Sequence, residues 1–403
     1  MADMFTAGKL GSLTLPNRLV RSAVWEGLGD DQGLITDKLV RYHERLAQGG
    51  VGLIILGYTS VWANYRQSPG QTAIAGDEAI PGFKELTEAV HRSGGRISIQ
   101  LAHVGPQTTP EMAGGKTPVG ASAIEHPAFG TPRALSTAEV KQIVADFGQA
   151  ARRAVAAGFD AIQIHGAHGY LVSQFLSPRW NARSDEYGGS PENRMRFALE
   201  VYEQVRANAC KLPVFIKLNL DDLIEGSTTP AEALPLAQRL SELGIDAIEV
   251  SAGGPASGQG PARTKIKTEA DEAYFLDLAR QTRKVVKCAL MVVGGFRSPS
   301  VIAAAIGSGA VDFVTLGRPL IREPNLPNRW KAGDLSKAKC ISCNGCFTTL
   351  KYGEGIQCLV ELKAREKAEQ EPKPATKIKP PAKAGKATTK KKAPSAGKTK
   401  HGQ

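Results

Sequence analysis

Short apolar runs recur along the chain, and longer stretches with helical spacing of their apolar residues separate them. Each run is rich in Val, Ile or Leu, which is typical of parallel strands buried on both faces. Between the runs, stretches such as 35–48, 80–93 and 230–243 place apolar residues three and four positions apart, which indicates amphipathic helices. The predicted strands are 18–24, 52–57, 96–102, 161–166, 214–219, 247–253, 290–295 and 313–317.

This alternation predicts the α/β class, with a (β/α)8 barrel (TIM barrel) over residues 1–335. A doubly wound sheet is the alternative, but no G-x-G-x-x-G turn follows the first predicted strand. Barrel enzymes build their active sites at the C-terminal ends of their strands. Polar residues and glycines gather directly after the predicted strands, so these positions form the candidate site.

Of the 403 residues, 42% are hydrophobic, which is enough for a large core. No apolar run approaches the roughly 20 residues of a membrane-spanning helix. The first twenty residues lack the features of a secretory signal. We therefore expect a soluble, cytoplasmic protein that is a monomer or a homo-oligomer.

The net charge of +12 is concentrated near the C-terminus, where residues 373–403 hold ten lysines and no acidic residue. Without them, 41 basic residues face 39 acidic ones, which leaves a net charge of +2. The segment has almost no large apolar side chains, so a disordered basic tail is predicted over 366–403. Contact with nucleic acid is expected only as weak electrostatic attraction to this tail.

The segment HGAHGY at 165–170 directly follows the fourth predicted strand. Two imidazoles three residues apart can donate hydrogen bonds to one carbonyl oxygen that gains negative charge, and the phenol of Tyr170 can deliver a proton. His165, His168 and Tyr170 are therefore the candidate catalytic residues. Half of a metal site is the alternative for the two histidines, but no third ligand follows at metal-site spacing.

Two glycine turns, VVGGFRS at 292–298 and TLGRPLI at 315–321, follow the last two predicted strands. Glycine lets backbone N–H groups approach an anion, and Arg297 or Arg318 can add charge-assisted bonds. The loops after strands seven and eight are the recurrent phosphate site of this fold. Tight turns that need glycine only for their backbone are the alternative.

Lys217 lies near the end of the very apolar fifth predicted strand. A buried ammonium group needs an anionic partner, because its burial is otherwise costly. A cofactor that becomes anionic on reduction would provide one. An ion pair with Asp221 or Asp222 is the alternative.

The segment HGAHGYLVSQFLSPRWNARSDEYGGSPENRMRFALE at 165–200 closely resembles the signature segment of the old yellow enzyme family of FMN ene-reductases (NADH:flavin oxidoreductases). The similarity continues in LPNRLVRSAVWEG at 15–27, in IQLAHVG at 99–105 and in the two glycine turns, and it covers residues 4–365. The resemblance implies FMN as the cofactor, NAD(P)H as the reductant and an electrophilic alkene as the substrate.

In this family pattern, His165 and His168 hold the activating carbonyl or nitro oxygen, and Tyr170 protonates the α-carbon. Trp25 is a departure, because relatives often carry there a Thr or Cys that bonds the flavin and tunes its potential. The flavin-binding residues that the resemblance implies are Ala23, Val24, Trp25, Tyr58, Gln100, Lys217, Gly253, Gly294, Gly295, Gly317 and Arg318.

Four of the six cysteines, Cys340, Cys343, Cys346 and Cys358, cluster with the spacing C-x2-C-x2-C-x11-C. Such thiolates suit a [4Fe–4S] cluster or a tetrahedral Zn ion, and the absence of any metal is the third possibility. The segment resembles the cluster-binding region of bacterial 2,4-dienoyl-CoA reductase and trimethylamine dehydrogenase, which have one more residue between the second and third cysteines. We expect a Cys-rich extension over 336–365 that packs on the barrel. An electron-relay cluster would need a separate redox partner protein.

Three functional hypotheses follow. The first is an FMN-dependent NAD(P)H oxidoreductase that transfers hydride to the activated C=C bond of an enone, enoate or enoyl thioester by a ping-pong mechanism. The second is an enzyme that resembles the flavin and iron–sulfur amine dehydrogenases. The third is a nucleic-acid-associated protein that uses its basic tail, and the near-neutral body argues against it.

Overall fold

The structure is a computed structural model that describes residues 4–258, 260–352, 354–370, 385, 387–397 and 402. Residues 1–363 form one compact unit, and residues 364–403 are assigned to a second unit. Most of the predicted basic tail lies outside the described residues. Within the described part of the chain, no helix is long and apolar enough to cross a membrane.

Parallel strands form the centre of the first unit. Within the described residues, eight of them close into a barrel in chain order, because β4 pairs with β6 and the last strand returns to the first. The predicted (β/α)8 barrel is therefore confirmed. The barrel strands are β3 (Leu19–Arg21), β4 (Leu53–Ile55), β6 (Ile97–Ala102), β9 (Ala161–Gly166), β10 (Val214–Asn219), β11 (Ala247–Ser251), β12 (Ala289–Val292) and β13 (Phe313–Leu316).

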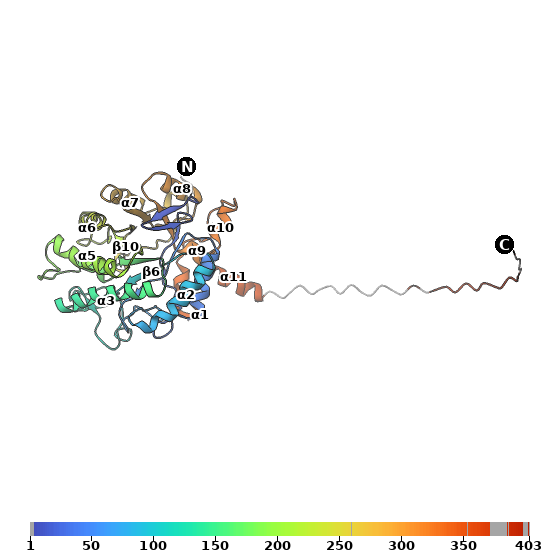
Figure 1. The fold of residues 1–403 in the computed structure, drawn as a ribbon, viewed down its shortest axis with the longest axis horizontal. Coiled ribbons are helices and arrows are strands. Elements are labelled where there is room, and N and C mark those ends of the chain that lie inside the picture. Colours follow the sequence, from blue (N-terminus) through green and yellow to red (C-terminus); the bar gives the residue numbers. More distant parts are fainter. Residues whose placement is uncertain are drawn as a thin grey trace. The chain divides into compact units, whose positions relative to one another are not determined.

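Helices between the strands surround the barrel, with β6 and β10 visible inside the ring of helices in Figure 1. The helices predicted at 35–48, 80–93 and 230–243 are present as α1, α2 and α6, with ends that differ by one or two residues. The main helices are α1 (Asp37–Gln48), α2 (Ile80–Arg92), α3 (Thr137–Ala156), α5 (Pro191–Asn208), α6 (Pro230–Glu242), α7 (Leu276–Arg283) and α8 (Pro299–Gly307).

Shorter elements close the ends of the barrel and build its loops. A hairpin of β1 (Gly8–Leu10) and β2 (Leu13–Leu15) precedes the first barrel strand. The other short strands are β5 (Thr59–Ser60), β7 (Val119–Gly120) and β8 (Arg133–Ala134). The other α-helices are α4 (Leu171–Leu176), α9 (Arg318–Arg322), α10 (Leu326–Lys331) and α11 (Leu359–Gln370), and 3-10 turns lie at Asp77–Ala79, Pro255–Ser257, Glu269–Asp271 and Gly345–Tyr352.

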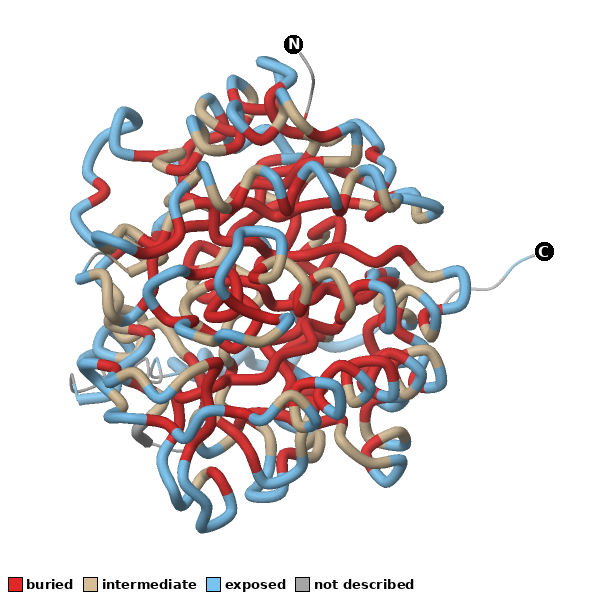
Figure 2. The backbone as a smooth tube through the Cα atoms, turned by 90° about the vertical axis from the view of Figure 1, so that its left-hand side faces the viewer, coloured by how far each residue is buried: buried red, intermediate tan, exposed pale blue. Residues whose placement is uncertain are grey.

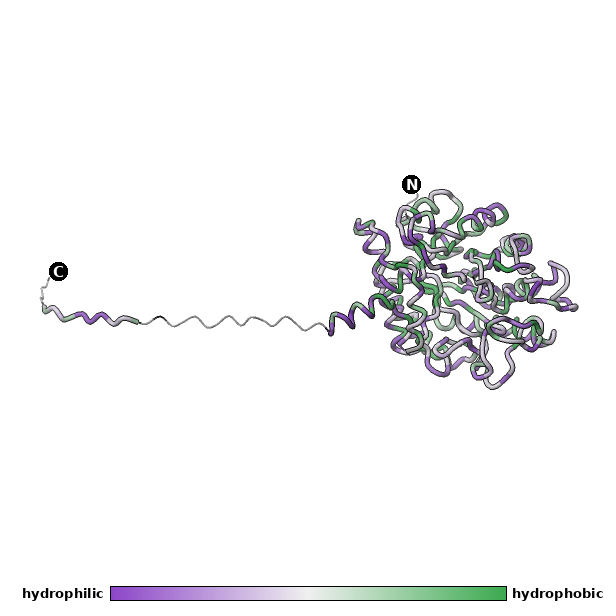
Figure 3. The backbone as a smooth tube through the Cα atoms, turned by 180° about the vertical axis from the view of Figure 1, so that it is seen from behind, coloured by the Kyte–Doolittle hydropathy of each residue, from purple (hydrophilic) through white to green (hydrophobic). Residues whose placement is uncertain are grey.

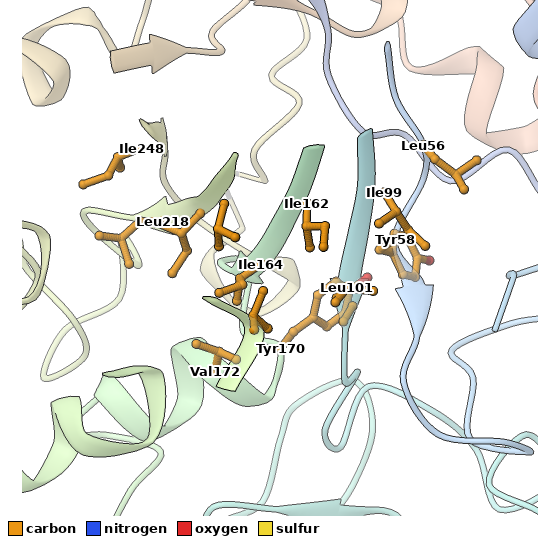
Figure 4. Packing of buried hydrophobic residues seen from close by; sticks show 14 of the residues in the cluster. Leu56, Tyr58, Ile99, Leu101, Ile162, Ile164, Tyr170, Val172, Leu218 and Ile248 are labelled. Carbon is orange, nitrogen blue, oxygen red and sulfur yellow. The ribbon is translucent and has the colours of Figure 1, made fainter. Parts of the chain in front are cut away.

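The barrel wall separates two apolar clusters, because successive side chains of a strand point to opposite faces. Outward residues such as Ile162, Ile164 and Leu218 belong to the cluster that includes the helices, and Figure 4 shows them beside one another on β9 and β10. Buried residues occupy the interior of the folded unit in Figure 2, and hydrophobic residues run through its interior in Figure 3. Hydrophobic burial of the helix faces therefore stabilises the wall from outside.

The inner cluster fills the N-terminal end of the barrel. Leu10 and Leu15 of the hairpin pack there against Val20, Phe215 and Phe313 of the strands. Apolar side chains thus close this end of the barrel. The next inward-facing position of each strand lies two residues further along, and polar residues can occupy it. The functional site lies on that side.

Candidate active site

A cavity of about 420 Å³ opens at the C-terminal ends of the barrel strands. Its volume lies within the range of small-molecule and cofactor pockets. Most of the residues predicted for the site line it, whereas Gly253 and Gly294 do not. The predicted residues in its lining are Ala23, Val24, Trp25, Tyr58, Gln100, His165, His168, Tyr170, Lys217, Gly295, Gly317 and Arg318.

The end of β9 and the loop after it position the two histidines. His165 lies in the strand, and its Nδ1 accepts a hydrogen bond from the backbone N–H of Ala167 at 3.2 Å. His168 has a left-handed backbone, with a φ of 62°, and its Nε2 lies 2.8 Å from Ser251 Oγ. The two ring centroids are 5.2 Å apart. Because Nδ1 of His165 is an acceptor, its Nε2 carries the hydrogen and can donate to a ligand.

Both histidines are neutral at ordinary pH. Burial, the neighbouring His168 and the charge of Lys217 hold the pKa of His165 well below its ordinary value. Burial, together with the charge of Lys217, lowers the pKa of His168 to about 3. A neutral imidazole still donates one hydrogen bond, so the pair can stabilise a developing oxyanion without carrying charge.

Two tyrosines share one acceptor beside the histidines. The hydroxyl of Tyr170 donates to Gln67 Oε1 at 2.7 Å, and the hydroxyl of Tyr58 donates to the same oxygen at 2.5 Å. Burial raises the pKa of both phenols, so both keep their protons. Figure 4 shows Tyr58 and Tyr170 among the buried side chains that pack beside β6 and β9. Gln67 also lines the cavity, but no sequence pattern marks it, because it lies in an irregular loop.

Lys217 has a partner that the sequence did not reveal. Its Nζ lies 3.0 Å from Glu249 Oε1 and donates to Ser22 Oγ at 2.8 Å. The predicted alternative of an ion pair with Asp221 or Asp222 is wrong. Parallel pairing places Lys217 directly opposite Glu249 on the neighbouring strand, with both side chains inside the barrel.

The carboxylates of the loop after β10 are engaged locally. Asp222 accepts hydrogen bonds from Asn219 Nδ2 at 2.8 Å and from Ser227 Oγ at 2.7 Å. Asp221 Oδ1 accepts from the backbone N–H of Leu223. Neither carboxylate is therefore directed at Lys217.

The opposite end of the cavity carries the glycine turns. Gly295 has a φ of 74°, and a Cβ there would lie 2.6 Å from the ring of Tyr274. Arg318 donates from Nη1 to the backbone oxygen of Arg263 at 2.8 Å and to Asn344 Oδ1 at 2.6 Å. Arg297 does not line the cavity, because its buried side chain donates to the backbone oxygen of Ile266.

The cavity fits a flat phosphorylated cofactor. Val24 and Trp25 offer apolar walls, Gln100 and Lys217 offer a polar edge, and a cationic turn at Arg318 suits a phosphate. Among the described residues, no side chain or backbone group pairs with the buried Nε1 of Trp25. An unpaired buried donor is costly, and a bound acceptor would satisfy it.

The four clustered cysteines border a second, small cavity together with Arg318. Cys340 and Cys346 are buried, Cys358 is half-buried and Cys343 is exposed. Burial raises the pKa of Cys340 and that of Cys346, the latter to about 11. Within the described chain, no three His, Cys, Asp or Glu side chains are arranged to hold a metal ion.

The Cys-rich segment also reaches the main cavity. Phe347 lines it, one residue after Cys346. The backbone N–H of Ile356 donates to the backbone oxygen of Glu26 at 2.8 Å, next to Trp25. The cysteine segment therefore forms part of the cavity wall, which the cysteine spacing alone did not indicate.

The fold and the cavity define the class of the protein, a (β/α)8 barrel with a cofactor-sized cavity at the C-terminal ends of its strands. Residues 3–336 match the model of the NADH:flavin oxidoreductase / NADH oxidase family. The chain therefore belongs to this family, which implies FMN as its cofactor.

Relatives of this chain are named as reductases, oxidases and dehydrogenases. It is 38% identical to an NADH oxidase from Thermoanaerobacter brockii, over 86% of this chain and 53% of that protein. It is 34% identical to an NADPH dehydrogenase from Bacillus subtilis, over 80% of this chain and 92% of that protein. A solved structure of 2-naphthoyl-CoA reductase matches with a TM-score of 0.83 and 27% identity, over 89% of this chain and 56% of that chain. The chain thus spans about half the length of two of these relatives.

Proposed function

We propose that this protein is an FMN-dependent NAD(P)H oxidoreductase that reduces an activated C=C bond by a ping-pong mechanism. The convergence of His165, His168 and Tyr170 on one cavity carries the proposal. The similarity to an NADPH dehydrogenase and to 2-naphthoyl-CoA reductase supports it. Bound FMN would supply the hydride transfer between the nicotinamide and the alkene.

The residues of the chain would divide the remaining work. His165 and His168 would donate hydrogen bonds to the activating oxygen of the substrate as it gains negative charge. Tyr170, which keeps its proton because burial raises its pKa, would deliver that proton to the α-carbon. Gln100 and Lys217 would hold one edge of the flavin, and Gly295, Gly317 and Arg318 its phosphate. The apolar wall around Trp25 would exclude water.

Replacement of the proton donor tests this proposal. In Tyr170→Phe, we expect alkene reduction to slow by about 10²-fold or more, because general acid catalysis is lost. Reduction of the bound flavin by NAD(P)H should persist, since that step needs no phenol. Stopped-flow measurement of the two half-reactions separates these effects.

Two outcomes would contradict the proposal. Equal loss in both half-reactions would refute the role of Tyr170. A colourless wild-type protein that takes up no added FMN would refute the cofactor. Reduction of the flavin by alkylamines and not by NAD(P)H would instead support the amine dehydrogenase hypothesis.

We also propose that Cys340, Cys343, Cys346 and Cys358 hold a [4Fe–4S] cluster. All four border one cavity, which supports a common ligand. Their spacing suits a [4Fe–4S] cluster or a tetrahedral Zn ion, and the resemblance of the segment to cluster-binding regions favours the cluster. Iron and acid-labile sulfide in near-equal amounts in anaerobically purified protein would support the cluster. Stoichiometric zinc without sulfide would refute it.

A further inference from the structure

Glu249 is the centre of a polar layer inside the barrel, and the proposed chemistry gives it no role. It lies on β11 and is 0% exposed. The inner apolar cluster, which fills the N-terminal end of the barrel, lies directly beneath it. A fully buried carboxylate is costly unless charge and hydrogen bonds compensate it.

Four donors meet the two oxygens of Glu249. Its Oε1 accepts from Ser22 Oγ at 2.9 Å and from Thr315 Oγ1 at 2.8 Å, and it lies 3.0 Å from Lys217 Nζ. Its Oε2 accepts from Gln163 Nε2 at 2.7 Å. An ionised carboxylate only accepts, so this set of donors matches the charged form.

The network reaches the cavity only through the neighbours of Glu249. Ser22, Lys217 and Thr315 line the cavity, whereas Glu249 and Gln163 do not. Glu249 therefore lies one layer below any bound ligand. It can act on that ligand only through its charge and through the groups that it holds in place.

Glu249 also fixes the orientation of two amides. Because its carboxylate takes the NH2 group of Gln163, the oxygen of Gln163 must face the other way. That oxygen accepts from Gln100 Nε2 at 2.6 Å. The amide oxygen of Gln100 then ends this series of hydrogen bonds. Lys217 lines the same cavity as Gln100 and presents an ammonium group there.

We propose that Glu249 is a positioning residue that balances the charge of Lys217 and thereby sets the reduction potential of the bound flavin. The inference rests on the proposed function, because it requires FMN in the cavity. A positive charge at the ring edge stabilises the reduced, anionic flavin relative to the oxidised one. The carboxylate of Glu249, 3.0 Å from the ammonium group, weakens that stabilisation.

The reduction potential of FMN-loaded, full-length protein tests the inference. In Glu249→Gln, the charge of Lys217 is no longer balanced. We expect reduced FMN to be held about tenfold more tightly relative to oxidised FMN, which corresponds to a midpoint about 30 mV higher. Glu249→Asp keeps the charge and should stay close to the parent value.

A matched control uses the other end of the same strand. Asp246 directly precedes β11 and pairs with Arg206 at 3.1 Å, away from the cavity. Asp246→Asn removes a paired carboxylate of the barrel and should leave the midpoint unchanged. A midpoint that rises equally in both variants would show a general effect of lost charge and would overturn the inference.

The partner variant covers the case in which Glu249→Gln fails to fold. Lys217→Met leaves the carboxylate unbalanced and should lower the midpoint, and the double variant with Glu249→Gln should return it to near the parent value. Opposite shifts that cancel are not expected from a merely structural role. A double variant that stays as low as Lys217→Met, or a midpoint of FMN-loaded Glu249→Gln that equals the parent value, would overturn the inference. Wild-type protein that binds no FMN would instead refute the proposed function.

Discussion

His168 adopts a backbone conformation that residues with a Cβ rarely take. Its φ is 62°, and Gly169 follows with a φ of 77°. A left-handed conformation costs a non-glycine residue about 1 kcal/mol or more. This conformation directs the imidazole toward Ser251 and into the cavity. The backbone strain at His168 therefore accompanies its position in the site.

The protonation of the two histidines gives a prediction about pH. Because burial lowers the pKa of His165 and of His168, both stay neutral as the pH falls through their ordinary value near 6.5. We expect the rate of alkene reduction by the reduced enzyme to stay constant between about pH 5.5 and 8. Stopped-flow rates over this range provide the measurement. An acidic limb with a midpoint near 6.5 that vanishes in His165→Asn would show that the imidazole protonates during catalysis.

At the scale of elements, α3 shows how local sequence fixes a helix. Ser136 accepts a hydrogen bond from the backbone N–H of Glu139 at 3.3 Å, and Glu139 Oε2 accepts from the backbone N–H of Ser136 at 2.8 Å. This capping box satisfies two groups that would otherwise lack partners at the start of the helix. Arg133 also donates hydrogen bonds to the Glu139 carboxylate. This contact is the main reason that the pKa of Glu139 is lowered to about 2.

Removal of this cap should destabilise the protein measurably. We expect Ser136→Ala to lower the free energy of unfolding by about 1 kcal/mol, because the first turn of α3 loses its side-chain acceptor. Urea titration monitored by circular dichroism would measure the loss. Gln142→Ala on the same helix removes one exposed hydrogen bond, to Asp146, and should cost at most about 0.5 kcal/mol. Equal costs for the two variants would contradict a special role for the cap.

At the scale of the whole molecule, the charge and the site occupy different parts of the chain. All the residues that line the main cavity lie within 1–363, the first compact unit. Residues 373–403 carry ten lysines, and without them the net charge falls from +12 to +2. Truncation after residue 372 should therefore remove most of the net positive charge and leave all the residues that line the cavity in place.

We expect a chain truncated after Pro372 to keep its FMN and its rate of alkene reduction. Its retention on a cation exchanger should fall sharply, since most of the net positive charge is gone. Absorbance of the bound flavin and steady-state rates measure the first effect. Loss of FMN from the truncated chain would show that the tail contributes to the site.

Much of the fold and part of the site could be read from the sequence. Strands and helices follow from the local spacing of apolar residues, and barrel topology places the strand ends together at one face. His165, His168 and Tyr170 could be placed together at the cavity from the sequence, because they lie in one short segment at the C-terminal end of a strand. The sequence marks Lys217 as a buried cation, but it does not identify Glu249 as the partner.

Only the tertiary structure decided which distant residues meet. Glu249 meets Lys217 because β10 and β11 pair in parallel register, and closure of the barrel brings Ser22 to the same carboxylate. Gln67 meets Tyr170, which lies 103 residues further along the chain, and no periodic pattern marks that contact. The sequence alone determined the strands, the helices and the local His-His-Tyr segment, since each depends on neighbours within one element. The pairing of Lys217 with Glu249 depends on the register between β10 and β11, which local sequence patterns do not encode.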